Sequence, residues 1–293
     1  MKPVPFNYLC AYSLEEALYH LQSNENAKVI AGGQSLMPML NFRVVQPALL
    51  VDIGKLVELD YIKEVNDRIV IGALTRHTTV GSSQLIKDYI PVMHEALKYV
   101  AHLAIRNKGT IGGSLSHADP AAEYPMLSLL LDAEIYCEST KGERVIPASN
   151  FFAGSLSTAL DDDEILTKIS FPKLAQCTGW AFEEFAQRNG DFALAAVGVL
   201  LSKNSENKIQ KVKLAAMGVG ETALRLNEIE QLLISKPYSD DLCEAAAHSL
   251  SSILTPNTDL HASANYRLHL TGELLKKTLK LAWNMASVET SYE

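Results

Sequence analysis

Two glycine-containing stretches have the residue types and spacing expected of a nucleotide site. The first glycine segment, residues 29–36, reads Val-Ile-Ala-Gly-Gly-Gln-Ser-Leu and joins an apolar run to a predicted helix. Glycines permit positive φ and let a ligand approach the backbone closely. Amides at the start of a helix also attract anions. We therefore expect the amides of Gln34 and Ser35 to point into a pyrophosphate cradle formed with Gly32 and Gly33. The segment is neither a Walker A loop nor G-x-G-x-x-G.

The second glycine segment, residues 105–125, is predicted to be one long loop that leads into a helix. Connections of this length are usually functional. Thr110 and Ser114 can donate to phosphate oxygens, and Asp119 or Glu123 can accept from sugar or ribityl hydroxyls. Each segment alone also fits a purely structural turn. The pair is more specific, because a dinucleotide has a pyrophosphate and two hydroxylated arms. We expect unpaired amides of both segments to converge on one diphosphate.

Other reactive side chains are scattered. The four cysteines, Cys10, Cys137, Cys177 and Cys243, form no close pairs, so we expect no disulfide framework, zinc site or iron–sulfur site within the chain. The histidines that we considered lack metal-binding spacing too, and they are His77, His94, His102 and His117. We therefore predict no metal ligand and no catalytic acid, base or nucleophile.

Composition argues against a nucleic-acid-binding protein and against a membrane protein. The net charge is −8 and no cluster of basic residues is visible, which argues against a nucleic-acid partner. No run of about 18 apolar residues is present, so no membrane span is expected. The N-terminus lacks the long apolar stretch of a signal peptide, and we expect a cytoplasmic location.

Three units should position the glycine segments. Unit 1–56 is predicted to hold a helix from Ser13, with Glu16 completing a capping box, to about residue 22, strands at 28–31 and 49–53, and a short helix at 36–42. Unit 57–176 should hold hairpin turns at 66–67 and 140–142, helices at 80–89, 91–101 and 126–131, and a strand at 165–171. Unit 177–293 should hold three antiparallel strands, at 180–187, 192–202 and 211–218, followed by helices. In the last of these, Tyr266, Leu270, Leu274 and Leu281 fall on one face.

At both glycine segments the chain resembles the FAD-binding medium subunits of molybdenum hydroxylases. Residues 31–36 are similar to the family pattern A-G-G-x-S/D-L, and residues 110–125 to T-I/L-G-G-N/S-L-x-x-A-D-P-A-A-D/E-x-P. Residues 185–193 are similar to its R-x-x-D-x-A strand. The resemblance covers essentially the whole chain. It implies an α+β protein with the two-part FAD-binding fold of the vanillyl-alcohol oxidase (PCMH) type, followed by a C-terminal three-stranded antiparallel sheet with helices.

The resemblance also implies roles for individual residues. The first glycine segment would take the FAD pyrophosphate, residues 110–114 would hold phosphates and line the flavin, and Ile165 or Leu166 would approach the isoalloxazine. Ser114 replaces a more usual Asn, and Glu123 an Asp near the ribityl or ribose. Phe192 replaces a Tyr of some members, and Glu183 stands where xanthine dehydrogenase has Lys. The cofactor-binding residues that we expect are Val29, Ile30, Ala31, Gly32, Gly33, Gln34, Ser35, Leu36, Ala101, Thr110, Ile111, Gly112, Gly113, Ser114, Asp119, Glu123, Ile165, Leu166 and Phe192.

The function implied by this resemblance is electron transfer within a complex. A large molybdopterin subunit would oxidise the substrate, and a small subunit with two [2Fe-2S] clusters would pass electrons to FAD on this chain and on to an external acceptor. A heterotrimer, or a dimer of heterotrimers, is expected. The alternatives are a free-standing FAD-dependent oxidoreductase of the same fold and a non-catalytic assembly protein.

Overall fold

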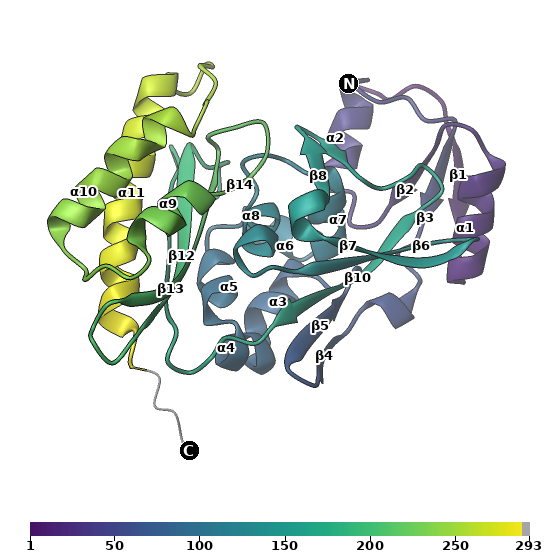
Figure 1. The fold of residues 1–293 in the computed structure, drawn as a ribbon. Coiled ribbons are helices and arrows are strands. Elements are labelled where there is room, and N and C mark those ends of the chain that lie inside the picture. The colour runs from purple at the N-terminus through teal and green to yellow at the C-terminus, as the bar shows by residue number, and fades with distance from the viewer. Residues whose placement is uncertain (289–293) are drawn as a thin grey trace.

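Three main sheets lie in chain order along the molecule, with helices between and beside them (Figure 1). The structure is a computed structural model that describes residues 1–288. The N-terminal sheet and the four-stranded C-terminal sheet lie toward opposite ends of the molecule, and the five-stranded sheet lies between them. Within the described residues, no helix has the length and apolar character needed to cross a membrane.

The N-terminal sheet is parallel, with strand order β1-β3-β2, and its strands are β1 (Asn7–Cys10), β3 (Leu49–Asp52) and β2 (Ala27–Ile30). Helices α1 (Leu14–Ser23) and α2 (Leu36–Asn41) follow β1 and β2. The predicted N-cap at Ser13 is confirmed, because the Ser13 hydroxyl accepts from the Glu16 N–H. The Glu16 carboxylate reaches Tyr12, one residue before the cap. Cys10, Ile30 and Asp52 share one register position, so the segments after all three strands leave from the same edge.

The central sheet is antiparallel, with order β4-β5-β10-β6-β7. Its strands are β4 (Ile62–Val65), β5 (Arg68–Gly72), β10 (Ile165–Pro172), β6 (Glu134–Ser139) and β7 (Gly142–Pro147), and a small hairpin of β8 (Phe152–Gly154) and β9 (Ser157–Thr158) lies beside it. Both predicted hairpin turns are confirmed, with Asn66 and Gly142 at positive φ.

Six helices lie between the central and C-terminal sheets (Figure 1): α3 (His77–Ser82), α4 (Gln84–Tyr89), α5 (Pro91–Ala96), α6 (Leu103–Arg106), α7 (Ile111–His117) and α8 (Glu123–Leu130). The single helix predicted at 80–89 is wrong, because extended backbone at Ser83 divides it into α3 and α4. The helix predicted at 91–101 ends earlier, at Ala96. The long loop predicted at 105–125 is also wrong, since α7 and the first turn of α8 lie within it.

The C-terminal sheet has four antiparallel strands, β11 (Gly179–Phe185), β12 (Ala195–Lys203), β13 (Ile209–Met217) and β14 (Leu224–Arg225). The predicted count of three is therefore wrong, because β14 has two residues and leaves no periodic pattern. Helices α9 (Asn227–Leu233), α10 (Asp240–Ser249) and α11 (Ala264–Met285) cover one face of this sheet.

The buried face of α11 differs from the one predicted. Tyr266 and Leu281 are 42% and 43% exposed, whereas Arg267, Thr271 and Thr278 are buried. The two threonine hydroxyls donate to carbonyls one helical turn earlier, which satisfies them within the helix. Leu270 and Leu274 do pack against the core beneath this helix, so the prediction is wrong for Tyr266 and Leu281.

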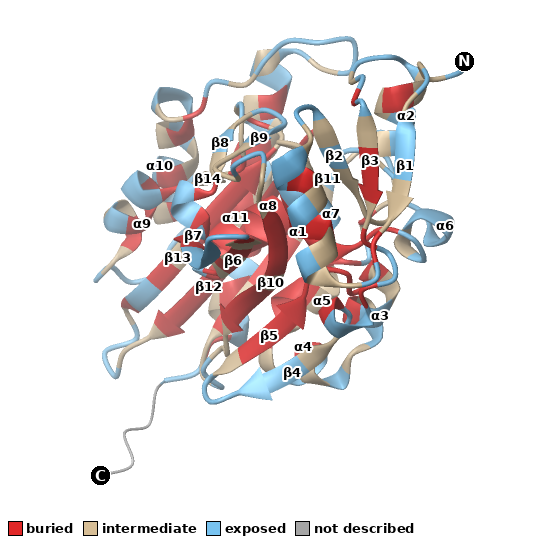
Figure 2. Ribbon diagram, turned by 90° about the vertical axis from the view of Figure 1, so that its right-hand side faces the viewer, coloured by how far each residue is buried: buried red, intermediate tan, exposed pale blue. Residues whose placement is uncertain are grey.

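Strand β12 is buried on both faces (Figure 2). Val197 and Val199 belong to the core formed with α9, α10 and α11. Ala196 and Leu200 belong to the central core, which also contains residues of α5, α7 and α8. The C-terminal sheet therefore closes one side of the central core, with β12 and β13 against α8 and β11 against α5.

Candidate functional site

The two glycine segments contact each other at Gly32. A Cβ atom at that position would overlap the carbonyl oxygen of Lys108 and lie 2.9 Å from the Cα atom of Gly109. The Lys108 carbonyl also accepts a hydrogen bond from Arg76, which precedes α3. The two segments therefore lie side by side, since only glycine allows this approach.

The first glycine segment presents free backbone donors. Within residues 1–288, the N–H groups of Gly32, Gly33, Gln34 and Ser35 donate to no acceptor. Gly33 has φ +71°, in the left-handed region that favours glycine. The Gln34 side chain donates to the Gly32 carbonyl at 2.9 Å, which holds the turn. Unpaired N–H groups on one turn are the donor set that a diphosphate needs. Val29 and Ile30 end β2, and Leu36 begins α2.

The backbone N–H groups of the second glycine segment already donate to acceptors within the protein. Ile111 and Gly112 donate to the carbonyls of Thr75 and Ala73, and Gly113 donates to the Thr110 hydroxyl at 3.1 Å. The Ser114 N–H donates to the Thr110 carbonyl. The expectation of free amides at these positions is therefore wrong, because α7 and its N-cap occupy them. The segment can offer the Thr110 and Ser114 hydroxyl protons instead.

The glycines of the second segment serve close packing. A Cβ atom at Gly109 would lie 2.5 Å from His77 Nε2, and one at Gly112 would lie 2.6 Å from the Ala73 Cβ atom. These glycines let the start of α7 lie against Ala73, which follows β5, and let the residue before Thr110 lie against His77 of α3.

The two acidic residues of the second segment have different environments. Asp119 Oδ1 accepts from the Ala121 N–H at 2.9 Å, so part of this carboxylate holds the turn before α8. Glu123 opens α8 and is partly buried. Burial raises the pKa of Glu123 to about 7, the charge of Asp119 raises it further, and Arg106 opposes the shift.

Glu184 of β11 is a partly buried acidic residue that the sequence reasoning did not consider. Side chains alternate along a strand, so Glu183 and Glu184 point to opposite faces. Glu183 pairs with Lys277 of α11 at 2.8 Å, away from the glycine segments. Burial and the charge of Glu123 raise the pKa of Glu184 to about 9. Its buried Oε2 has no hydrogen-bond partner in the described part of the chain.

Two further polar groups lie buried beneath the second segment. His77 Nδ1 and the Tyr124 hydroxyl are without partners among residues 1–288, and their rings lie 5.1 Å apart between centroids. Burial lowers the pKa of His77 to about 4, aided by the charges of Arg76 and Arg106. Buried polar groups normally find partners, so unpaired ones mark a place for water or a ligand.

The remaining predicted residues are spread around this region. Ile165 and Leu166 are buried in the N-terminal and central cores, so their side chains present no free face. Ala101 has φ +40° and its carbonyl accepts from Arg106. Phe192 is 68% exposed on the loop after β11. Gly190 of that loop packs against His102, so this loop lies against the one that carries Ala101.

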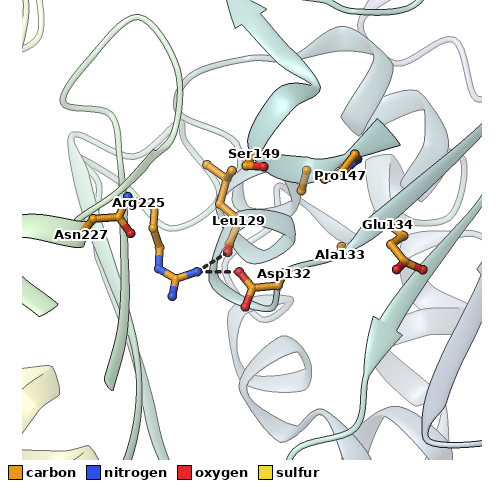
Figure 3. A pocket seen from close by; sticks show the side chains of 9 residues that line it. Leu129, Asp132, Ala133, Glu134, Pro147, Ser149, Arg225 and Asn227 are labelled. Carbon is orange, nitrogen blue, oxygen red and sulfur yellow. Dashed lines mark hydrogen bonds and ion pairs between the residues drawn. The ribbon is translucent and has the colours of Figure 1, made fainter. Parts of the chain in front are cut away.

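A separate hollow of about 360 Å³ lies where the central sheet meets β14 (Figure 3). The Arg225 guanidinium spans it, donating to the Leu129 carbonyl at 3.0 Å and to Asp132 at 2.7 Å. The same guanidinium also pairs with Glu230. Because Arg225 already has these partners within the protein, we interpret the hollow as a structural gap between two domains. No residue of either glycine segment lines it.

The chemistry of the site fits a flavin dinucleotide. Free amides on the first segment suit a diphosphate, hydroxyls and carboxyls on the second suit its sugar and ribityl arms, and an exposed aromatic ring lies on a neighbouring loop. Across residues 1–288, no group of three or more His, Cys, Asp or Glu side chains is arranged to hold a metal ion. The fold and site thus define a dinucleotide-binding protein.

Comparison with known proteins identifies the family. A model of the FAD binding domain in molybdopterin dehydrogenase matches residues 4–174, and one of the CO dehydrogenase flavoprotein C-terminal domain matches residues 180–282. The chain is 39% identical to the 6-hydroxypseudooxynicotine dehydrogenase complex subunit alpha of Paenarthrobacter nicotinovorans, over 98% of this chain and 97% of that one.

Solved structures of molybdenum hydroxylases support the same family assignment. A structure of carbon monoxide dehydrogenase from Hydrogenophaga pseudoflava matches with a TM-score of 0.95 and 35% identity, covering 98% of this chain and all (100%) of that one. Quinoline 2-oxidoreductase from Pseudomonas putida 86 matches with a TM-score of 0.92 and 34% identity, covering 97% and 99%. The chain belongs to the family of FAD-binding medium subunits of molybdenum hydroxylases.

Proposed function

We propose that this chain carries electrons from [2Fe-2S] clusters of a small partner subunit to an external acceptor, through FAD held between the two glycine segments. A large molybdopterin subunit would oxidise the organic substrate. Bound FAD supplies the step between one-electron clusters and the acceptor, and the protein orients it. The observation that carries the proposal is the set of free amides at Gly32–Ser35, packed against the second segment.

Individual residues have defined roles in this proposal. The amides of residues 32–35 bind the diphosphate, and the hydroxyls of Thr110 and Ser114 donate to it or to the flavin. Glu123 accepts from a ribityl or ribose hydroxyl, and the exposed ring of Phe192 covers the flavin. Ile165 and Leu166 are buried, so they would approach the isoalloxazine through their backbone.

The domain division is part of the same proposal. We assign residues 1–56 and 57–176 to the two halves of a vanillyl-alcohol oxidase type FAD-binding fold, and residues 177–293 to a third domain. The family match supports a complex with a small and a large partner, as a heterotrimer or a dimer of heterotrimers. The relative from Hydrogenophaga pseudoflava is itself named a medium chain.

Purification from the native host tests this function. The chain should emerge yellow, with one FAD per chain, together with one chain that has paired cysteine motifs and one much larger chain. Substrate should reduce the flavin in this complex. Recovery of the chain alone, turning over an organic donor with FAD, would favour a free-standing oxidoreductase. Recovery without stoichiometric flavin would favour an assembly protein.

A further inference from the structure

The start of α3 is joined to the second glycine segment at Gly109. The His77 N–H donates to the Gly109 carbonyl at 3.1 Å. Beside this bond, the Ile111 N–H donates to the Thr75 carbonyl, also at 3.1 Å. The His77 side chain reaches the same glycine, since a Cβ atom on Gly109 would lie 2.5 Å from His77 Nε2. His77 therefore contacts Gly109 through both its backbone and its ring.

Gly109 is also a residue on which the first glycine segment packs. A Cβ atom on Gly32 would lie 2.9 Å from the Gly109 Cα atom and would overlap the neighbouring Lys108 carbonyl oxygen. The Arg76 guanidinium donates to that carbonyl, which holds it in place. The free amides of the first segment begin at Gly32, so a shift of Gly109 would move the donors that are proposed to bind the diphosphate.

The His77 ring lies against the ring of Tyr124, which belongs to α8. Their centroids are 5.1 Å apart and their planes are tilted by 30°. Both residues are almost fully buried, with 6% of His77 and 1% of Tyr124 exposed. Neither His77 Nδ1 nor the Tyr124 hydroxyl has a hydrogen-bond partner among residues 1–288. Two unpaired polar atoms on two touching buried rings indicate a shared partner, because buried polar atoms rarely stay unpaired.

A water molecule suits the chemistry of both atoms. Burial and the charges of Arg76 and Arg106 lower the pKa of His77, so at neutral pH the ring is neutral and has one donor and one acceptor nitrogen. A phenol hydroxyl and a water molecule each donate and accept. The two guanidiniums already donate to the carbonyls of Lys108 and Val100. A water bound by both rings therefore satisfies them without a charged partner.

We propose that His77 and Tyr124 bind one buried water molecule, and that His77 held in this way is a positioning residue for FAD binding. The inference rests on the proposed function and deepens it, because neither side chain is among the residues assigned there to bind FAD. The bound water fixes the His77 ring against Gly109, which keeps Gly109 against Gly32. Loss of the water frees the ring and loosens the contact between the two glycine segments.

The melting temperature of the full chain without FAD tests the water site. Tyr124→Phe removes one hydroxyl and keeps the ring. If a water bridges this hydroxyl to His77, the variant should melt lower, by about 2 °C. An unpaired hydroxyl gives the opposite sign, because its removal ends the cost of burying it. An unchanged or higher melting temperature would overturn the proposal. Tyr99→Phe, at a half-buried ring of the same core, should leave the temperature unchanged.

Nitrogen NMR of the flavin-free chain, labelled in its histidines, reports on the same site directly. The signals of His77 are identified by their loss in His77→Asn. Its Nδ1 signal should shift in Tyr124→Phe, because the water loses one partner, and should stay in place in Tyr99→Phe. The same Nδ1 signal in Tyr124→Phe and in the unsubstituted chain would count against a bridge between the two rings.

The Kd for FAD, measured by quenching of flavin fluorescence, tests the positioning role. Tyr124→Phe should raise Kd by about two- to tenfold, whereas Tyr99→Phe should leave it unchanged. His77→Asn places an amide near the Nδ1 position and should raise Kd less than His77→Leu, which fills space alone. Equal Kd values in Tyr124→Phe and the unsubstituted chain would overturn the positioning role. If the unsubstituted chain binds no FAD, the proposed function fails, and the melting temperature and NMR signal still decide whether the water site exists.

Discussion

The N–H of Gly218, which follows β13, donates to the carbonyl oxygen of Pro120 at 2.9 Å. This bond ties the C-terminal sheet to the second glycine segment. The Gly218 carbonyl in turn accepts from the Arg267 guanidinium at 3.0 Å, and Arg267 also donates to the Leu194 carbonyl at 2.6 Å. Helix α11 therefore holds the ends of β12 and β13 where they meet the candidate site.

Loss of the Arg267 side chain should destabilise the whole protein. Arg267→Ala leaves two buried carbonyls without donors, and we expect a loss of about 2–4 kcal/mol in the free energy of unfolding. Urea unfolding measures it. Lys276→Ala on the same helix breaks only surface ion pairs and should cost under about 1 kcal/mol. Equal losses in the two variants would contradict the role given to Arg267.

An alanine at Gly32 should empty the site of flavin. Its methyl group would push the first glycine segment away from Lys108 and Gly109, which disrupts the diphosphate cradle. The FAD content after gel filtration, read from flavin absorbance, should fall to near zero. Gly154→Ala is the matched control, because nothing lies within 4 Å of a Cβ atom there. Full flavin content in Gly32→Ala would argue against the cradle.

Thr110 should contribute to stability through its capping bond. Its hydroxyl accepts from the Gly113 N–H at 3.1 Å, so Thr110→Ala should lower the free energy of unfolding by about 0.5–2 kcal/mol. Thr110→Ser keeps the hydroxyl and should recover most of the loss. If the serine variant is as unstable as the alanine variant, the cap is not the cause.

Acid should destabilise the protein through His77. Burial lowers the pKa of His77 to about 4 in the folded chain, below its ordinary value of 6.5. Between these values the unfolded chain binds more protons, so stability falls as the pH falls from about 6.5 to about 4, by up to ~1.4 kcal/mol per pH unit. Unfolding curves of His77→Asn should show a shallower fall in this window. His248→Asn, an exposed histidine variant, should follow the unsubstituted chain.

Features fixed by neighbouring residues could be predicted from the sequence. The N-cap at Ser13, the hairpin turn at Asn66 and the strand that leads into Gly32 depend on local propensity, and the structure has all three. The same applies to the buried strands of the C-terminal sheet, which appear as long apolar runs.

Features fixed by distant residues could not be predicted. Helix α7 contains two adjacent glycines, which disfavour a helix, and it forms because Thr110 caps it and Ala73 packs on Gly112. Glu184 lies on a strand that is remote in sequence from both glycine segments, so its unpaired buried oxygen carried no local signal. On α11, Arg267 is buried because Leu194 and Gly218 accept from it, which no helical periodicity reveals.

Strand β12 contributes side chains to two hydrophobic cores. Ala196 and Leu200 pack in the central core, and Val197 and Val199 pack in the core beneath α9, α10 and α11. Neither half of the protein can finish folding while this strand is missing, so heating should melt both in a single cooperative transition. If the chain were cut between the two cores, the fragments would have to re-form both cores when they associate. The same holds for a hybrid whose C-terminal domain comes from a distant homologue. The FAD-binding region is therefore not expected to fold without the C-terminal sheet.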